Sequence, residues 1–308
     1  MTKITKFFFS LLITLTVFIW AAVVKSPSGT GCNIYFFDVG QGDAALIEKG
    51  DYQILIDGGP DDKILSEIGK AMPLTDRKIE IVILTHPHAD HLVGINQVLD
   101  RYEIGKIYST GAIHTSNAYL EFLDKVKNKN IQLEVPDAGQ EIVPFDNGEL
   151  EFLWPGKRDV GKSAEDNNLN NTSLVNQFCY FDHCVLLMGD LETDGQAEML
   201  NYYFSKQSEA SVEKSESKSS QPLASNDNIF QSEILKVAHH GSVNGTNQKL
   251  LDVVRPKYAV IGVGADNKYG HPHAATLDLL QKASIQYYRT DRDGTIEFNL
   301  SESGITKK

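Results

Sequence analysis

The chain has 308 residues, of which 41% are hydrophobic and 9% aromatic. That is enough apolar material for one large core or two small domains, and it excludes a chain that is disordered throughout. The formal net charge of −12 argues against a protein that binds nucleic acid mainly through a broad basic surface. A polyanionic substrate is compatible with this charge where metal ions meet its phosphate.

The N-terminal segment is basic and then apolar. Lys3 and Lys6 precede an uncharged run at 7–24, which is about long enough to cross a bilayer as a helix. Trp20 is bulky where a signal-peptidase site needs small residues, so cleavage is not favoured. Residues 1–32 are therefore predicted to hold a cytoplasmic stub, an uncleaved single-pass membrane anchor and a short stalk. The catalytic domain would be extracytoplasmic, or secreted if the segment were cleaved.

The chain has three cysteines. Cys32 follows the apolar run, but Gly29 stands where a lipid-attachment site needs a leucine-like residue, so lipidation is only an alternative to the anchor. Cys179 and Cys184 flank residues 180–183, which have the pattern of a hairpin turn. Outside the cytoplasm these two could pair across the hairpin. Free thiols in adjacent strands are the alternative, because hairpin geometry often misses the required Cα separation.

From residue 33 onward, apolar and β-branched runs alternate with helical patterns. In the first half, strands are predicted at 33–38, 43–48, 52–57, 79–84, 104–109, 131–135, 141–145 and 149–154, and helices at 61–71, 91–101 and 115–128. In the second half, strands are predicted at 173–180, 184–189, 233–238, 257–263, 285–289 and 295–300, and helices at 192–203, 246–254 and 274–283. Two comparable halves predict an α/β (α+β) domain at 33–303, with two stacked sheets and helices outside.

One segment breaks this alternation. Residues 205–228 are rich in serine, lysine and glutamate and nearly lack apolar residues. Such a segment buries too little apolar surface to offset the entropy lost on ordering. We predict a disordered surface insertion here, with a recognition loop as the alternative.

The strongest chemical signal is the stretch THPHADH, which directly follows the apolar run at 79–84. A strand that ends in a tight loop presents several side chains to one small volume, and imidazoles and carboxylates bind divalent ions. His86 and His88 point the same way from an extended segment. Asp90 and His91 lie at the turn into the next helix, where a second ion can sit. The alternative is a set of surface residues at a helix start, with Asp90 as its cap.

This stretch resembles the H-x-H-x-D-H signature of the metallo-β-lactamase superfamily. Five further segments resemble the soluble C-terminal domain of the ComEC DNA-uptake proteins: FDVGQGDA at 37–44, LLMGD at 186–190, LKVAHHGS at 235–242, YGHPH at 269–273 and RTDRDG at 289–294. Their order and spacing cover most of the chain after residue 33. The resemblance implies a four-layer αββα fold with two stacked mixed sheets, and a metal-dependent hydrolase.

The resemblance also implies a ligand set for two divalent ions, zinc or manganese. The implied ligands are His86, His88, Asp90, His91, Asp190 and His239. The first two would bind one ion and the next two the other, while Asp190 would bridge both. One histidine of the pair 239–240 would complete the second site, with His239 preferred and His240 supporting the ligands. Asp57 would be the buried carboxylate that orients ligand histidines. From the residues alone, a turn aspartate before two glycines is the simpler interpretation of Asp57.

One departure concerns the first ion. Many superfamily members place another histidine before the bridging aspartate, but between His91 and Asp190 only His114 and His183 occur, and both are expected at the surface. The matching region at 167–173 is instead rich in asparagine. The first site should therefore be weaker, and ions that accept oxygen ligands, manganese or magnesium, compete with zinc.

Hydrolysis is the implied reaction, because divalent ions make water a better nucleophile and polarise the bond that is cleaved. Asp90 is the candidate general base. His271, with His273 nearby, is a candidate for touching a substrate phosphate or protonating a leaving group; exposed histidines at a helix start are the alternative. We expect a phosphodiesterase or nuclease related to DNA uptake (competence), with single-stranded DNA as substrate. The alternatives are another hydrolase on this fold, such as a phosphorylcholine esterase, lactonase or β-lactamase, and a non-catalytic DNA-binding surface component.

Overall fold

The computed structural model describes residues 3–24, 31–161, 163, 169–216 and 228–308. The chain forms two compact units, 1–30 and 31–308. The first unit contains helix α1 (Lys3–Val24), and the second contains all the sheets.

Helix α1 corrects one prediction. Within the described residues, no helix combines the length and the apolar content that a membrane crossing requires. The single-pass N-terminal anchor, and the membrane location based on it, were therefore wrong. The prediction relied on the absence of charge over 7–24, which is a criterion taken from the sequence alone.

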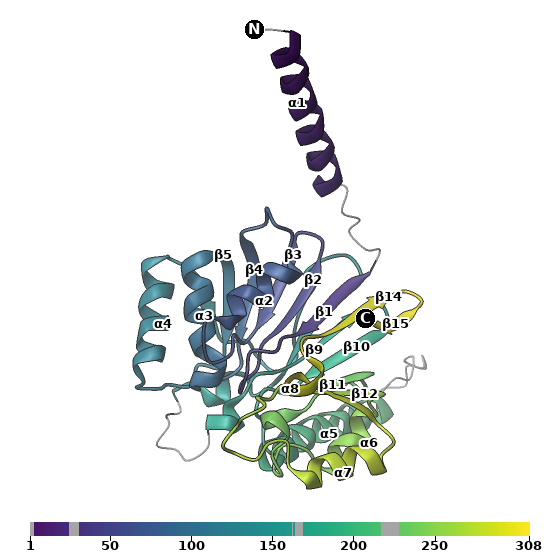
Figure 1. Ribbon diagram of the computed structural model, residues 1–308. Helices are drawn as coiled ribbons and strands as arrows, with labels where there is room; N and C mark the ends of the chain where they lie inside the picture. Colours follow the sequence, from purple (N-terminus) through teal and green to yellow (C-terminus); the bar gives the residue numbers. More distant parts are fainter. Residues whose placement is uncertain (1–2, 25–30, 162, 164–168, 217–227) are drawn as a thin grey trace. The chain divides into compact units, whose positions relative to one another are not determined.

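The second unit is built on two sheets (Figure 1). The eight-stranded sheet has the order β15 (Gly304–Lys307), β14 (Ile296–Ser301), β1 (Cys32–Phe36), β2 (Ala45–Lys49), β3 (Tyr52–Ile56), β4 (Lys78–Leu84), β5 (Glu103–Ser109) and β6 (Gln132–Glu134). The seven-stranded sheet has the order β13 (Gln286–Arg289), β12 (Tyr258–Ile261), β11 (Ile234–Lys236), β10 (His183–Leu187), β9 (Val175–Tyr180), β8 (Gly148–Trp154) and β7 (Gln140–Ile142). Both sheets are mixed, because each combines parallel and antiparallel pairs.

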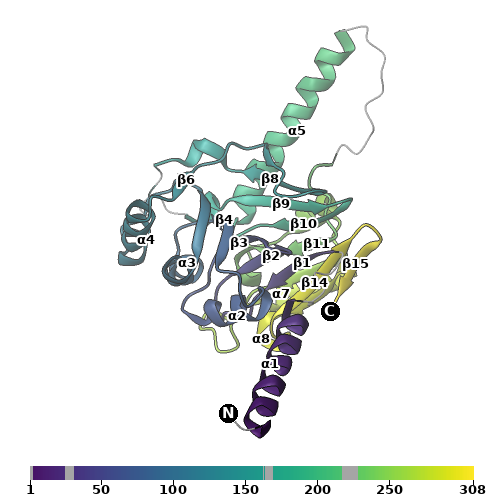
Figure 2. The ribbon, with the colours of Figure 1, turned by 90° about the horizontal axis from the view of Figure 1, so that it is seen from above.

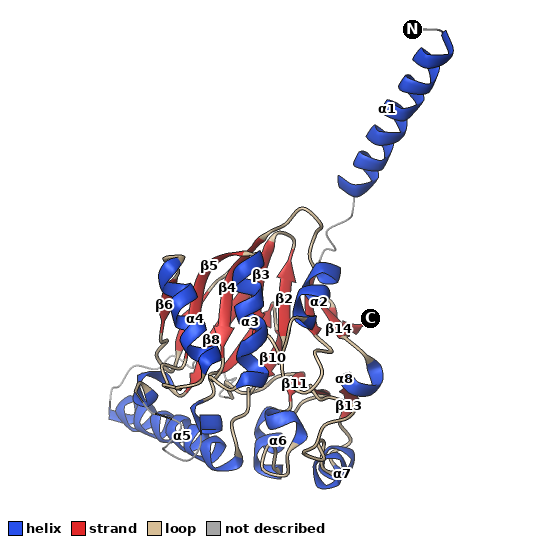
Figure 3. Cartoon of the chain, turned by 60° about the vertical axis from the view of Figure 1, so that its left-hand side comes forward, coloured by secondary structure: helices blue, strands red, loops and turns tan. Residues whose placement is uncertain are grey.

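Helices cover the outer face of each sheet. The first sheet carries α2 (Lys63–Ala71), α3 (Ala89–Arg101) and α4 (Asn117–Asn128), and the second carries α5 (Thr193–Glu216), α6 (Gln248–Val254) and α7 (Ala274–Lys282). Figure 3 shows α3 and α4 in front of the strands of the first sheet, with α5, α6 and α7 along the bottom of the view. A short helix, α8 (Thr290–Asp293), precedes β14.

Three separate apolar clusters hold these layers together. One includes Phe36 and Phe178 and lies between the two sheets, whose strands are seen in Figure 2. The second joins the first sheet to its helices, where Leu92 is fully buried, and the third joins the second sheet to its helices through residues such as Leu200. Because strand side chains alternate between faces, each sheet contributes to two clusters. The predicted four-layer αββα arrangement is confirmed.

The parallel strand pairs define the edge of the sheets at which a ligand site is expected. In the first sheet β3, β4 and β5 run parallel and are joined by α2 and α3, and in the second β10, β11 and β12 run parallel. Loops that follow the carboxyl ends of parallel strands gather at one edge, and this is where open α/β sheets bind ligands. The segments that follow β3, β4, β10 and β11 contain Asp57, the stretch THPHADH, Asp190 and the pair 239–240.

The segment at 205–228 differs from the prediction in its first half. Helix α5 continues to Glu216, so residues 205–216 are helical. Lysine, glutamate and alanine have high intrinsic helix propensity. A prediction based on apolar content alone does not include this propensity. Residues 217–227 of the predicted insertion lie outside the described residues.

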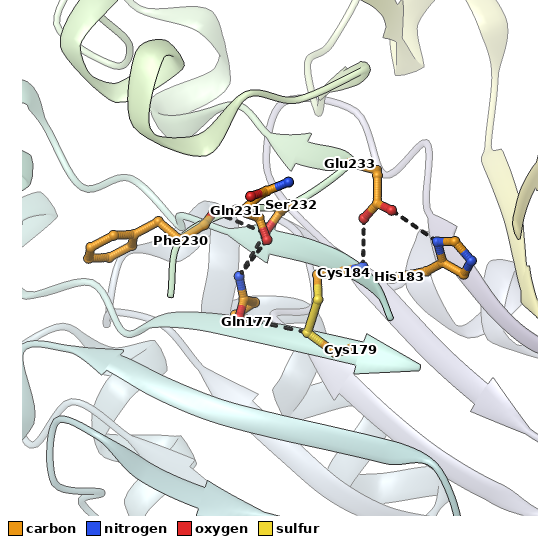
Figure 4. The surroundings of a disulfide bond; sticks show 8 residues. All are labelled: Gln177, Cys179, His183, Cys184, Phe230, Gln231, Ser232 and Glu233. Carbon is orange, nitrogen blue, oxygen red and sulfur yellow. Dashed lines mark hydrogen bonds and ion pairs between the residues drawn. A yellow bond between two sulfur atoms is a disulfide. The ribbon is translucent and has the colours of Figure 1, made fainter. Parts of the chain in front are cut away.

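The structure pairs Cys179 with Cys184 in a disulfide across the β9–β10 hairpin, with a Cα separation of 4.1 Å (Figure 4). Beside it, Glu233 accepts a hydrogen bond from the Cys184 backbone N–H at 2.9 Å and contacts His183 Nδ1 at 2.9 Å. His183 thus lies at the hairpin, as expected. The third cysteine, Cys32, is a buried free thiol in β1.

Candidate metal centre

Four side chains from both halves of the fold converge at the loop edge. Asp90, His91, Asp190 and His240 each offer one ligand atom, and these atoms lie within 4.8 Å of one another. His91 Nε2 lies 3.3 Å from Asp190 Oδ2. His240 Nε2 lies 3.2 Å from Asp90 Oδ2 and 3.5 Å from Asp190 Oδ2. Three of the four side chains are buried, and Asp90 reaches the surface.

His86 and His88 form a second group next to this cluster. His86 Nε2 lies 2.9 Å from His88 Nδ1 and 3.9 Å from Asp190 Oδ2. Asp190 therefore lies between the two groups, which is the position that a bridging carboxylate needs.

Ser173 is a supporting residue that the sequence reasoning missed. Its hydroxyl accepts a hydrogen bond from the Asp190 backbone N–H at 3.1 Å and lies 3.4 Å from His86 Nδ1. It directly follows the 3-10 helix η3 (Leu169–Thr172), inside the asparagine-rich region at 167–173. A single serine is not part of a recognisable sequence motif, so this contact could be identified only from the structure.

The cluster fits a divalent cation by its chemistry. His91 Nε2 and Asp190 Oδ1 are buried, and neither has a hydrogen-bond partner among the described residues. Leaving a buried polar atom unpaired costs about 1–3 kcal/mol. Imidazole nitrogens and carboxylate oxygens are ligands that zinc and manganese accept. An ion between these atoms would satisfy them, so the residues present fit the metal that the sequence implies.

Asp57 orients His91. Its Oδ1 accepts a hydrogen bond from the Thr85 backbone N–H at 2.8 Å, and its Oδ2 accepts one from the Thr85 hydroxyl at 2.7 Å. The same Oδ2 lies 2.8 Å from His91 Nδ1. This contact fixes Nδ1 as a proton donor to Asp57 and leaves Nε2, on the Asp190 side, as the ring nitrogen that an ion would bind once it displaces the proton there.

The two adjacent histidines lie in different places. Both belong to the 3-10 helix η4 (Ala238–Gly241) and have left-handed backbones, with φ of 48° at His239 and 52° at His240. His240 points into the cluster, whereas His239 Nδ1 lies 3.1 Å from Glu192 Oε1. The sequence interpretation preferred His239, but this geometry favours His240 as the ligand. Neighbouring residues in such a turn diverge, and no spacing rule distinguishes them.

The electrostatics divide the histidines into two classes. Burial lowers the pKa of His86 well below its usual range and also lowers that of His88. Burial acts in the same direction on His240, but Asp190 and Asp43 outweigh it and raise the His240 pKa to about 10. Asp190 and Asp57 likewise raise the pKa of His91 well above its usual range against the effect of burial.

These directions predict proton release on metal binding. His91 and His240 carry protons at neutral pH, and an ion must displace them, whereas His86 and His88 are already neutral. We expect metal affinity to rise with pH by about tenfold per unit for each proton released, with about two protons released per chain near pH 7. Calorimetric titrations in buffers of different ionisation enthalpy count these protons. Affinity that does not change between pH 6 and 8 would contradict this assignment of charge.

A cavity of about 430 Å³ opens beside the cluster. Beyond the candidate ligands, its wall includes Gln41, His114, Asn170, His239, Tyr269 and His271. His114, expected to be an ordinary surface residue, thus lines the cavity, with its ring centroid 6.3 Å from that of His88. His273 does not line it: its Nδ1 accepts a hydrogen bond from the Val243 backbone N–H at 3.1 Å.

His271 lies in the cavity wall beside the other imidazoles. Its ring centroid is 5.5 Å from that of His239. Burial and the nearby His240 and His239 lower the pKa of His271 to about 4. A neutral imidazole at neutral pH suits a hydrogen bond to a phosphate oxygen better than delivery of a proton to a leaving group.

Residues 37–264 match the family model of the metallo-beta-lactamase superfamily. ComE operon protein 3 of Bacillus subtilis (strain 168) is 26% identical over 281 residues, which cover 85% of this chain and 32% of that protein. Competence protein ComA of Neisseria gonorrhoeae is 25% identical over 270 residues, covering 87% of this chain and 32% of that protein. The chain thus spans about a third of the length of these relatives.

Among solved structures, a point variant of the CmlA beta-hydroxylase aligns with a TM-score of 0.50 and 11% identity, over 87% of this chain and 54% of that chain. At this identity the likeness concerns the fold alone.

Proposed function

Because this chain belongs to the metallo-beta-lactamase superfamily, we propose that its metallo-hydrolase site cleaves phosphodiester bonds, with single-stranded DNA as the substrate. The observation that carries this proposal is the pair of ligand groups around Asp190, since two ions a short distance apart suit phosphoryl transfer. The similarity to a competence protein supports DNA as the substrate and DNA uptake as the role.

We propose two divalent ions. His86 and His88 would hold the first, and Asp90, His91 and His240 the second, with Asp190 shared. Besides the shared Asp190, the first group has only two protein ligands whereas the second has three, and Asn170 lines the same cavity as His88. Manganese, which accepts oxygen ligands, is therefore the ion we favour over zinc.

When bound, such ions lower the pKa of water and polarise the phosphoryl oxygens. In the proposed hydrolysis, water would add to phosphorus as the bond to one ester oxygen breaks, and the proton taken from the water would pass to the leaving oxygen, which gives a phosphate monoester and an alcohol. Asp90 can accept the proton of the attacking water because it is partly exposed at the cavity. Although burial opposes ionisation, the hydrogen bond from His240 holds the pKa of Asp90 below its usual range, so this carboxylate is ionised.

The cavity rim offers a platform for a nucleobase. The Tyr269 side chain is 55% exposed, and its ring is stacked on His271 with centroids 5.7 Å apart. Lys268 Nζ lies 5.4 Å from the Tyr269 ring centroid, close enough for a phosphate to bind beside a stacked base. Asn267 fixes this loop, because its Oδ1 accepts hydrogen bonds from the backbone N–H groups of Tyr269 and His271. An unpaired base can stack here, which favours a single strand.

The proposal is tested with the purified full chain and manganese or zinc, assayed on single-stranded DNA, bis-p-nitrophenyl phosphate and the β-lactam nitrocefin. We expect cleavage of both phosphodiesters, and a loss of at least about 100-fold in His88→Ala, because ligand loss costs more than loss of a supporting contact. Tyr269→Ala should raise KM for DNA by about tenfold and leave the small substrate unchanged, since only DNA has a base to stack. Hydrolysis of nitrocefin without phosphodiester cleavage would reject the proposal, as would no activity on any of the three.

A further inference from the structure

A buried ion pair lies directly behind the candidate metal centre. Lys236 Nζ is 2.7 Å from Asp43 Oδ2, and the two side chains are only 6% and 7% exposed. Lys236 ends β11 in the seven-stranded sheet, whereas Asp43 precedes β2 in the eight-stranded sheet. Removing two charges from water is costly, and such pairs are weak contributors to stability. The ion pair between Lys236 and Asp43 lies next to His240, which suggests a role in the metal centre rather than in stability.

The free oxygen of Asp43 faces His240. Asp43 Oδ1 lies 3.3 Å from His240 Nδ1, and the Gly262 carbonyl accepts a hydrogen bond from the same nitrogen at 2.9 Å. The Gly262 carbonyl places a proton on Nδ1, and the Asp43 carboxylate beside it favours that proton by its charge. The other nitrogen, Nε2, is then left toward Asp90 and Asp190.

The backbone around Asp43 is built for this close approach. The Asp43 N–H donates to the Asp90 carbonyl at 3.2 Å, so the same residue also touches the loop of another candidate ligand. A Cβ at position 42 would lie 2.2 Å from the Asp90 carbonyl oxygen, and a Cβ at position 262 would lie 2.3 Å from Asp43 Oδ1. Only glycine fits at Gly42 and Gly262 without moving these groups.

We propose that Asp43, held in place by Lys236, is a positioning residue that fixes His240 for metal binding, an inference that rests on the proposed metal centre. Asp57 and Asp43 would then have equivalent roles, because Asp57 orients His91 and Asp43 orients His240. Each half of the fold would supply one histidine of the second ion's site, and the first half would supply both carboxylates that hold these histidines. Lys236 anchors the Asp43 carboxylate by one oxygen, which leaves the other oxygen toward the imidazole.

The test separates positioning from stability. Asp43→Asn alone leaves the Lys236 charge buried without its partner, so it is expected to destabilise the fold. Asp43→Asn combined with Lys236→Met removes both charges and should recover the melting temperature of the metal-free protein. Manganese and zinc affinities are then measured by competition with a chromophoric chelator on the full-length chain. We expect the double variant to keep one ion with unchanged affinity and to bind the other about 10- to 100-fold more weakly.

A matched control is the ion pair between Lys106 and Glu134, whose Nζ and Oε2 atoms are 2.6 Å apart in β5 and β6. The variant Lys106→Met with Glu134→Gln should bind both ions as the wild type does. A double variant at 43 and 236 that binds both ions with wild-type affinity would overturn the positioning role. A wild type that binds two ions but cleaves no phosphodiester would reject only the proposed function, and a wild type that binds no ion would reject both.

Discussion

Replacing Asp190 by asparagine is expected to lower kcat/KM for phosphodiester cleavage by at least about 1000-fold, or about 4 kcal/mol of transition-state stabilisation. Asp190 Oδ2 lies within 3.9 Å of His86 Nε2 and 3.3 Å of His91 Nε2, so its charge serves both ligand groups. An amide keeps the shape of the carboxylate but cannot bridge two cations in the same way. Loss of this one carboxylate should therefore weaken the binding of both ions.

The measurement combines steady-state kinetics with the metal content of the dialysed protein. Asp194→Asn is a suitable control, because this residue lies nearby in the first turn of α5 but outside the cavity wall. We expect the control to keep its metals and activity. An Asp190→Asn variant with full metal content and activity within tenfold of the wild type would contradict the bridging role.

Replacing Gly94 by alanine should destabilise the protein, although alanine is the better helix former by about 1 kcal/mol. A Cβ at Gly94 would lie 1.8 Å from the Gly58 carbonyl oxygen. The Gly94 N–H also donates to the Gly59 carbonyl at 2.9 Å, so α3 packs directly against the loop after β3. Forcing them apart should lower the free energy of unfolding by about 3 kcal/mol. Metal affinity should fall as well, because the first turn of α3 carries Asp90 and His91.

Gly69→Ala in α2 is the matched control, because a Cβ there meets nothing within 4 Å. This variant should be as stable as the wild type or more stable by up to about 1 kcal/mol. Denaturant unfolding of both variants measures the difference. Equal stabilities for the two variants would show that the close approach of α3 to the Gly58 loop is not real.

The parts of the site that the sequence predicts are those in which chemistry and strand pattern coincide. The stretch THPHADH directly follows an apolar run; Asp57 and Asp190 also follow such runs, but their roles were implied only by the family resemblance. Because the carboxyl ends of parallel strands meet at one edge, residues far apart in sequence can be expected together there. The same alternation of strands and helices was enough to predict the layered fold.

The features of the site that could not be predicted from the sequence depend on contacts between distant segments. Asp43 and Lys236 are 193 residues apart, and nothing in either local pattern indicates a buried ion pair. The choice between His239 and His240 depends on the left-handed turn that separates their side chains. The N-terminal prediction rested on the absence of charge over 7–24, and absence of charge alone does not establish a membrane-spanning helix.

The metal centre itself is tested most directly by a crystal structure of the full chain grown with manganese, with anomalous diffraction recorded at the manganese edge. We predict two anomalous peaks on either side of Asp190, one beside His86 and His88 and the other beside His91 and His240. A pocket without either peak, with these imidazoles turned toward solvent, would contradict the metal centre and the hydrolytic chemistry derived from it.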